Sequence, residues 1–274
     1  MTTAFQSVAP PVEPFDAVAE EYDSSFTQSL IGTAQRESVW RAIDHHFRAG
    51  QRILEINCGT GIDAMRLSAR GIWVTACDAS AKMVRVARRR RDALHHGRRV
   101  DFRVLPTERI HQLEEEGPYN GVLSNFAGLN CVADLRAVAR DLARLVKPGD
   151  RALLCVFGRF CLWEMVWYLL QGNVRKAFRR LAQGSVAAHV GPGRSVLIRY
   201  PSIGSLRRDF APGFRLLNWM GVGIAVPPSY LEPWARRFPR LLRAAAWLDA
   251  FLGRTPGSRM LADHVVLVFE RVAT

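Results

Sequence analysis

The sequence predicts an α/β protein in which helices cover both faces of a doubly wound, parallel sheet. Apolar runs typical of buried strands alternate with helix-like segments five times within residues 1–157. The first run leads through Gly59-Thr60-Gly61 into a helix, which is the order found in nucleotide-binding folds. With 274 residues, 49% of them apolar, the chain has the size of one globular domain.

Periodicity and helix-ending residues place each element of the first half. Residues 15–48 are expected to be helical because apolar side chains recur on one face. Gly71 ends the second helix, and Ser80 is placed to cap the third. An amphipathic helix from about residue 135 stops at Lys147-Pro148-Gly149. Strands are expected at 53–56, 72–77, 100–104, 120–125 and 151–157.

The later half continues with further helices and strands. A helix is expected at 201–211, a strand at 214–226, a helix-rich stretch over 227–252 and a last strand at 263–272. The segment FCLWEMVWYLL, residues 160–170, is a helix candidate that is apolar nearly all round. Such a helix is buried, covers a hydrophobic pocket or lies at a membrane interface.

The formal net charge of +13 comes almost entirely from one region. Residues 158–260 carry 16 of the 38 Lys and Arg but only 4 of the 25 Asp and Glu, together with five of the seven Trp. Clustered Arg and Lys suit phosphates or anionic lipid headgroups. The surface is therefore expected to contact a membrane peripherally or to be a solvated lid.

The N-terminal residues and the cysteines indicate where the protein is located and whether it binds a metal. Residues 1–14, which contain three Pro, are expected to be a disordered lead without a secretory signal. The chain has no run of 18 apolar residues. The five Cys follow no metal-binding spacing and are expected to be buried free thiols in a reducing cytoplasm. We therefore expect a cytoplasmic protein without a metal.

The glycine turn fits two kinds of adenosine-containing cofactor. Residues 59–64 match the pattern G-x-G-x-x-A, and Asp78 ends the second strand 19 residues after Gly59. A carboxylate at that position can accept hydrogen bonds from both ribose hydroxyls, as in a nicotinamide dinucleotide or in S-adenosylmethionine. The glycines alone do not separate the two.

Glu55 favours the second cofactor. A pyrophosphate would meet this carboxylate at the end of the first strand, and two unit charges about 5 Å apart repel by roughly 3 kcal/mol at an effective dielectric near 20. S-adenosylmethionine instead carries an ammonium and a sulfonium there. Asn57 stands where a glycine is usual, and Asn is among the non-glycine residues that enter left-handed backbone most readily.

Four stretches together resemble a known family. They are FDAVAEEYD (15–23), ILEINCGTGIDAMRLSARGIWVTACDASAKMVRVAR (53–88), YNGVLSNFAGLNCV (119–132) and LARLVKPGDRALLCV (142–156). With them the chain resembles the class I, seven-stranded S-adenosylmethionine-dependent methyltransferases, especially the small-molecule branch that includes quinone-biosynthesis enzymes. The resemblance implies seven strands with an antiparallel last strand. It also implies a single domain over 15–274, with extra lid segments at about 158–200 and 227–260.

The resemblance also implies cofactor contacts. Glu55, Gly59 and Gly61 would surround the methionine portion, with Asn57 also in the cofactor-binding turn, and Asp78 would bind the ribose, with Ala79 and Met83 against the adenine. Thr107 and Glu108 would lie at the adenine edge, Asn125 and Phe126 at the methyl end, and Tyr22 on the helix that closes over the cofactor. The loop VLPTERI lacks the aspartate that often meets the adenine, because Pro106 stands there.

The expected reaction is an in-line methyl transfer from S-adenosylmethionine, which leaves S-adenosylhomocysteine, to a small hydrophobic acceptor of phenolic, isoprenoid, polyketide or lipid type. The protein would chiefly position the acceptor and exclude water. No catalytic signature is present. His189, in a Gly-rich loop, is the one candidate base, and His264 is expected to be structural. The alternatives are an RNA methyltransferase that uses the basic region and an NAD(P)-dependent oxidoreductase. Under the main interpretation, no nucleic-acid partner is expected.

Overall fold

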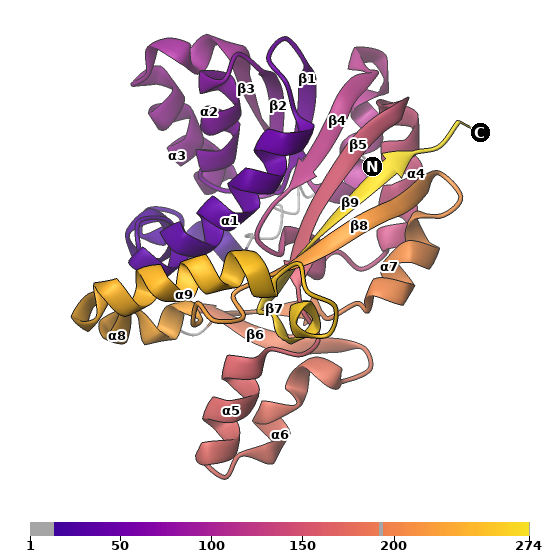
Figure 1. Ribbon diagram of the computed structural model, residues 1–274. Coiled ribbons are helices and arrows are strands. Elements are labelled where there is room, and N and C mark those ends of the chain that lie inside the picture. Colours follow the sequence, from indigo (N-terminus) through magenta and orange to yellow (C-terminus); the bar gives the residue numbers. More distant parts are fainter. Residues whose placement is uncertain (1–13, 192–193, 274) are drawn as a thin grey trace, which may run out of the picture.

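A single seven-stranded sheet organises the molecule (Figure 1). The computed structural model describes residues 14–191 and 194–273, so most of the expected disordered lead lies outside the described residues. The strand order is β3-β2-β1-β4-β5-β9-β8. The first five strands are parallel, and β9 is inserted antiparallel between β5 and β8. The α/β class and the antiparallel last strand are thereby confirmed.

The strands follow the sequence expectations closely, apart from an early start of the fifth strand and an end at Val222 of the strand expected over 214–226. Their bounds are β1 Arg52–Ile56, β2 Trp73–Asp78, β3 Val100–Val104, β4 Tyr119–Ser124, β5 Val146–Phe157, β8 Phe214–Val222 and β9 His264–Arg271. A separate hairpin consists of β6 Ser185–Gly191 and β7 Arg194–Arg199. The order reverses beside β1, which has β2 on one side and β4 on the other. Ligands of open α/β sheets bind at the carboxyl ends of such strands.

Helices cover the two faces of the sheet. One core packs α1 Leu30–His46, α2 Ile62–Ala69 and α3 Ala81–Asp92 against the strands, and the other packs α4 Leu135–Leu145 and α7 Ile203–Phe210 (Figure 1). Four further helices belong to the segments that follow β5 and β8, namely α5 Leu162–Leu170, α6 Val174–Ala177, α8 Glu232–Arg237 and α9 Pro239–Leu252.

Local signals explain several helix ends. Ser80 caps α3 as expected, since its Oγ accepts a hydrogen bond of 3.1 Å from the Met83 N–H. The expected helix over 15–48 is broken into Pro14–Ala17, Asp23–Thr27 and α1. The break has a physical cause, because the Oγ of Ser29 accepts from the Gly32 N–H at 2.9 Å and so starts α1 afresh.

The position of His189 needs correction, and one of the three surroundings left open for residues 160–170, full burial, is excluded. His189 lies in strand β6 rather than in a loop, paired with Ser195 of β7. Helix α5 is largely exposed, and Glu164 is its one buried residue. Among the residues that the structure describes, no helix combines the length and apolarity needed to cross a membrane.

Candidate cofactor and acceptor site

A cavity of about 240 Å³ opens at the carboxyl ends of β1, β2 and β4. Ten of the twelve expected cofactor residues line it, and Glu55 and Gly61 do not. Further lining residues come from the N-terminal segment, from α1 and α2, and from the loops after β3 and β4. The whole wall consists of Phe15, Tyr22, Arg36, Asn57, Cys58, Gly59, Thr60, Ile62, Asp63, Asp78, Ala79, Ser80, Met83, Pro106, Thr107, Glu108, Asn125, Phe126, Gly128, Cys131 and Val132.

Asn57 replaces the usual first glycine without disturbing the turn. Its φ is +57°, so this asparagine adopts the left-handed backbone that glycine would otherwise supply. Its amide donates to Thr107 Oγ1 at 2.8 Å and accepts from Ser124 Oγ at 3.2 Å. Asn57 therefore ties the ends of β1 and β4 to the loop after β3, so that the departure from the family pattern adds cross-links to the site.

Asp78 holds the turn against the end of β2. Its carboxylate accepts from the Gly59 N–H at 2.8 Å and from the Ser80 N–H at 2.9 Å. Gly61, with φ +74°, stands behind the wall, and a Cβ at this position would lie 2.5 Å from the Phe102 ring. Gly61 is thus required for close packing of the turn on the sheet, while Asp78 faces the cavity.

Glu55 is buried beneath the turn, with 1% of its surface exposed. Its Oε2 has no hydrogen-bond partner among the described residues. Burial raises the pKa of this carboxyl well above its usual range, and the neighbouring Asp63 adds to the rise. Glu55 therefore stands behind the cavity wall and is not part of its lining.

Arg36 is the cation that sequence reasoning missed. It is the one Lys or Arg in the described wall, and it comes from α1. Its Nη1 pairs with Asp63 Oδ2 at 2.6 Å, both side chains being almost fully buried. Asp63 also accepts from Trp40 Nε1 at 2.6 Å and from the Asn125 amide at 3.0 Å. No local pattern marks Arg36, because its partners are brought together by packing of α1 on α2.

The N-terminal segment closes one side of the cavity. Asp16 accepts from Ser80 Oγ at 2.5 Å, and Asp23 accepts from Thr60 Oγ1 at 2.7 Å and pairs with Arg90. These contacts pin the segment across the glycine turn, and Tyr22 lines the cavity. Burial raises the pKa of the Tyr22 hydroxyl, so it is a neutral group at physiological pH.

At the far end, Phe126 joins the cavity to an aromatic cluster. Phe126 and Ala127 have φ of +48° and +66°, a strained backbone of the kind that collects at functional sites. The Phe126 ring lies 5.3 Å from His264, which stacks on Phe157 at 4.8 Å. Phe157 in turn lies 6.0 Å from Tyr200 of the segment after β7. The cluster runs from the cavity to the insertion that follows β5.

A buried ionic network lies beside this cluster. Arg180 pairs with Glu164 at 2.7 Å and with Asp263 at 2.8 Å, and all three side chains are nearly inaccessible. His264 Nδ1 lies 3.4 Å from Asp263 Oδ2. Burial lowers the pKa of His264 although Asp263 opposes that shift, which leaves the imidazole neutral near pH 7. The network fastens the insertion to the start of β9.

Two expected residues have other surroundings than the sequence suggested. His189 is exposed on β6 and does not line the cavity. Cys131 is exposed and lines the cavity, so the expectation that all five thiols are buried is wrong for this residue. Among the described residues, no group of His, Cys, Asp and Glu side chains is arranged to hold a metal ion.

This strand order, the glycine turn after β1 and the carboxylate that ends β2 define a class I S-adenosylmethionine-dependent methyltransferase. Comparison with known proteins agrees, and the chain belongs to this family. The family described as methyltransferase domain matches residues 53–149. A ubiquinone biosynthesis O-methyltransferase of Bordetella bronchiseptica is 33% identical over 169 residues, which are 58% of this chain and 68% of the relative.

A second relative is matched over less of its length. A demethylmenaquinone methyltransferase of Clavibacter sepedonicus is 34% identical over 145 residues, 52% of this chain and 56% of the relative, so the chain spans little more than half of that protein. The solved CcbJ methyltransferase of Streptomyces caelestis is 16% identical, with a TM-score of 0.60 over 97% of this chain and 100% of the other. The last comparison shows the fold alone. None of these similarities favours an oxidoreductase or an RNA methyltransferase.

Proposed function

We propose that this protein transfers the methyl group of S-adenosylmethionine to a hydrophobic acceptor that carries a phenol or quinol ring. The observation that carries the proposal is the continuity between the cofactor wall and the aromatic cluster, through Phe126. Flat rings pack favourably on such clusters. The names of the two curated relatives, both from quinone biosynthesis, support an acceptor of this kind.

The charges of the wall suit each end of the cofactor. Asp78 would accept hydrogen bonds from the ribose hydroxyls, and Arg36 would form an ion pair with the methionine carboxylate. Glu55, with its unpartnered Oε2, lies beneath the turn, where the cationic ammonium and sulfonium of the bound cofactor would favour its ionised form. Around the adenine would lie Ala79, Met83, Pro106, Thr107 and Glu108.

The bound cofactor supplies a methyl carbon that its sulfonium already activates. The work of this chain is then to orient the acceptor in line with that carbon and to keep water away. The pinned N-terminal segment closes the cofactor side, and Phe126 stands where cofactor and acceptor would meet. His264 touches the Phe126 ring and acts as a positioning residue. We assign no role to His189, because it is exposed on the hairpin.

The two extra segments would select the acceptor. Residues 158–200 and 227–260 follow β5 and β8, which run in the same direction and so end at the edge of the sheet where the cavity opens. The first segment adds Tyr200 to the aromatic cluster. We therefore infer that they form a lid over the acceptor side. A cytoplasmic location stays a prediction.

Methyl uptake from isotope-labelled S-adenosylmethionine tests the proposal. We expect labelled product from hydrophobic phenols and quinols and none from RNA, with Asp78→Asn as a control of weakened cofactor binding and lower methyl transfer. Binding of S-adenosylhomocysteine, followed by calorimetry, shows separately whether the cofactor site is correct. If the cofactor bound but no ring-bearing acceptor were methylated across a broad panel, the acceptor class would be wrong. Labelling of RNA instead would favour the alternative.

A further inference from the structure

Helix α5 has an inverted distribution of polar and apolar side chains. Its one charged residue, Glu164, is 2% exposed and faces Arg180. The exposed face consists of large apolar residues, and Leu170 is 81% exposed. A helix on a water-facing surface normally shows the opposite arrangement. The exposed apolar residues of α5 are Leu162, Val166, Trp167, Leu169 and Leu170.

Helix α9 repeats this inversion. Its acid, Asp249, is 3% exposed and accepts hydrogen bonds from the backbone N–H groups of Gly223, Ile224 and Ala225. Trp247 is 77% exposed, and it lies on the outward face with Leu241, Leu248 and Phe251. In both helices, therefore, the acid is used internally and leucine and tryptophan side chains are left at the surface. Isolated exposed apolar residues are ordinary, but two such faces are not.

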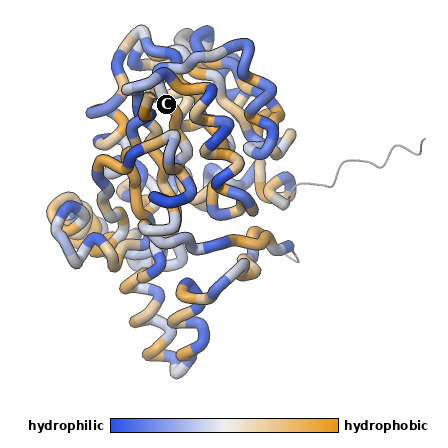
Figure 2. Tube along the Cα trace, turned by 90° about the vertical axis from the view of Figure 1, so that its right-hand side faces the viewer, coloured by the Kyte–Doolittle hydropathy of each residue, from blue (hydrophilic) through white to orange (hydrophobic). Residues whose placement is uncertain are grey.

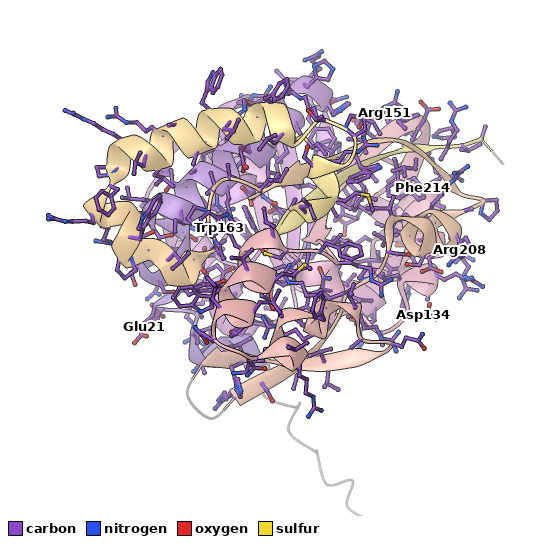
Figure 3. The ribbon with its side chains drawn as sticks, turned by 60° about the horizontal axis from the view of Figure 1, so that its bottom comes forward. Glu21, Asp134, Arg151, Trp163, Arg208 and Phe214 are labelled. Carbon is purple, nitrogen blue, oxygen red and sulfur yellow. The ribbon has the colours of Figure 1, made fainter. Side chains whose placement is uncertain are left out.

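The two faces belong to one end of the molecule. The rings of Trp167 on α5 and Tyr230, just before α8, lie 6.3 Å apart, so α5 contacts the segment that leads into α8 and α9. Figure 1 shows α5, α6, α8 and α9 together at the end away from the chain's C-terminus, and Figure 3 views that end directly, with side chains of α9 projecting outward. The hydropathy colouring of Figure 2 shows apolar segments in the same projecting parts. We call the exposed apolar residues of α5 and α9, with Tyr230, the apolar rim.

Positive charge surrounds the apolar rim. Arg175, Lys176, Arg237, Arg240 and Arg243 are exposed, and none forms an ion pair with a described residue. The three acids of the two insertions, Glu164, Glu232 and Asp249, are not exposed. Tryptophan and leucine between unpaired arginines are the composition of segments that lie in the interface of an anionic bilayer.

We propose that the apolar rim inserts shallowly into an anionic phospholipid surface, with the surrounding Arg and Lys on the headgroups. A second copy of the chain fits less well, because a symmetric contact through this face would oppose two sets of unpaired cations. The rim lies at the sheet edge where the cavity opens, so an acceptor dissolved in the bilayer would enter the cavity from the membrane. The entry of the acceptor rests on the proposed function, whereas binding of the rim to the bilayer does not.

Vesicle sedimentation with the full chain tests the inference. Phosphatidylcholine vesicles containing phosphatidylglycerol should bind the protein, and pure phosphatidylcholine or raised salt should weaken binding. Trp247→Glu should lower the partition coefficient about tenfold, and Arg240→Glu with Arg243→Glu should lower it comparably. Trp73→Glu is the matched control, because Trp73 is 51% exposed at the start of β2, the opposite edge of the sheet, and should leave binding unchanged.

Three readouts separate the outcomes. Every variant should bind S-adenosylhomocysteine as the parent does, which shows that the fold and cofactor site are intact whatever happens with vesicles. Equal binding to neutral and anionic vesicles, or no difference between Trp247→Glu and Trp73→Glu, would overturn the proposal. So would a dimer, detected by light scattering, that Trp247→Glu converts to monomer, since the occupant of the rim would then be a second copy.

Discussion

Arg36 and Asp63 form a buried ion pair, 2.6 Å between Nη1 and Oδ2, that connects α1 to α2 at the cavity wall. The guanidinium also lies 4.5 Å from the centre of the Phe126 ring. One pair thus fixes a cation where the methionine carboxylate is proposed to bind and supports the ring where cofactor and acceptor are proposed to meet. Removal of either partner would leave an uncompensated buried charge.

The first prediction concerns Arg36→Gln. We expect the affinity for S-adenosylhomocysteine, measured by calorimetry, to fall about ten- to a hundredfold, because a charge-assisted contact is worth roughly 1.5–3 kcal/mol. Affinity for 5′-methylthioadenosine, which has no carboxylate, should change much less. Equal losses for both ligands would mean that Arg36 acts only through the fold. The unfolding free energy should also fall, by about 3–5 kcal/mol, since Asp63 loses its partner.

Arg66→Gln provides the matched control for that stability effect. Arg66 pairs with Asp44 at the same distance of 2.6 Å, but both side chains are about one-third exposed. Solvent screens such a pair, so denaturant unfolding should show a loss of about 1 kcal/mol or less. Arg36→Lys keeps the positive charge and replaces Arg36→Gln in the ligand-binding comparison if Arg36→Gln does not fold.

The second prediction concerns Asp78→Asn, which removes charge with little change in shape. We expect S-adenosylhomocysteine to bind at least about tenfold more weakly, because the ribose hydroxyls lose an ionised acceptor and the Gly59 N–H a charge-assisted one. Asp101→Asn, on the exposed outer strand β3, should bind as the parent does. Unchanged affinity in Asp78→Asn would show that the ribose lies elsewhere.

The third prediction is a pH dependence that comes from Glu55. Its pKa is raised in the folded state, mainly by burial and further by Asp63 and Asp78, against the lowering effect of Arg36. The folded protein therefore keeps a proton that the unfolded chain releases, and this group makes stability fall as pH rises above its ordinary pKa near 4.5. Glu55→Gln should remove that slope. Relative to the parent, the variant should therefore gain more unfolding free energy at pH 7 than at pH 4.5.

Chemical denaturation at several pH values, without ligand, measures this effect. The ligand-free protein keeps Glu55 protonated, whereas a bound cation would favour its ionisation, so the informative comparison for Glu55→Gln is between S-adenosylmethionine and S-adenosylhomocysteine. In Glu55→Gln, the affinity for S-adenosylmethionine should fall more than the affinity for S-adenosylhomocysteine, because only the sulfonium carries the extra positive charge. A variant with parallel pH profiles to the parent would contradict the assignment of a buried, protonated Glu55.

The fourth prediction concerns Arg180→Met. Glu164 and Asp263 would both lose their buried partner, so unfolding free energy should fall by about 3–5 kcal/mol. Limited proteolysis should cut residues 158–200 faster, and acceptor KM should rise more than the dissociation constant of S-adenosylhomocysteine. Arg175→Met, at an exposed position without an ion pair, should stay within about 0.5 kcal/mol of the parent. Equal loss of acceptor and cofactor affinity would mean that the insertion is purely structural.

Elements that depend on neighbouring residues were predictable. The Ser80 cap, the left-handed Asn57 and the strand that ends in Asp78 need only short-range hydrogen bonds and backbone preferences. The surroundings of α5 were not predictable in the same way. Its composition allowed a buried helix, a pocket cover or an interfacial helix, and the exposed Leu170 excludes the first for most of its length.

The sequence by itself determined the class of fold, the family and most of the cofactor wall, because apolar periodicity and a glycine turn are local and the wall residues follow strand ends. Only the tertiary structure decided that Arg36 belongs to the wall, that Glu55 stands behind it, and that His264 supports Phe126. The physical reason is that burial and pairing of charges depend on which distant segments pack together. Residues 36 and 63, or 180 and 263, meet only once the sheet and its insertions have folded.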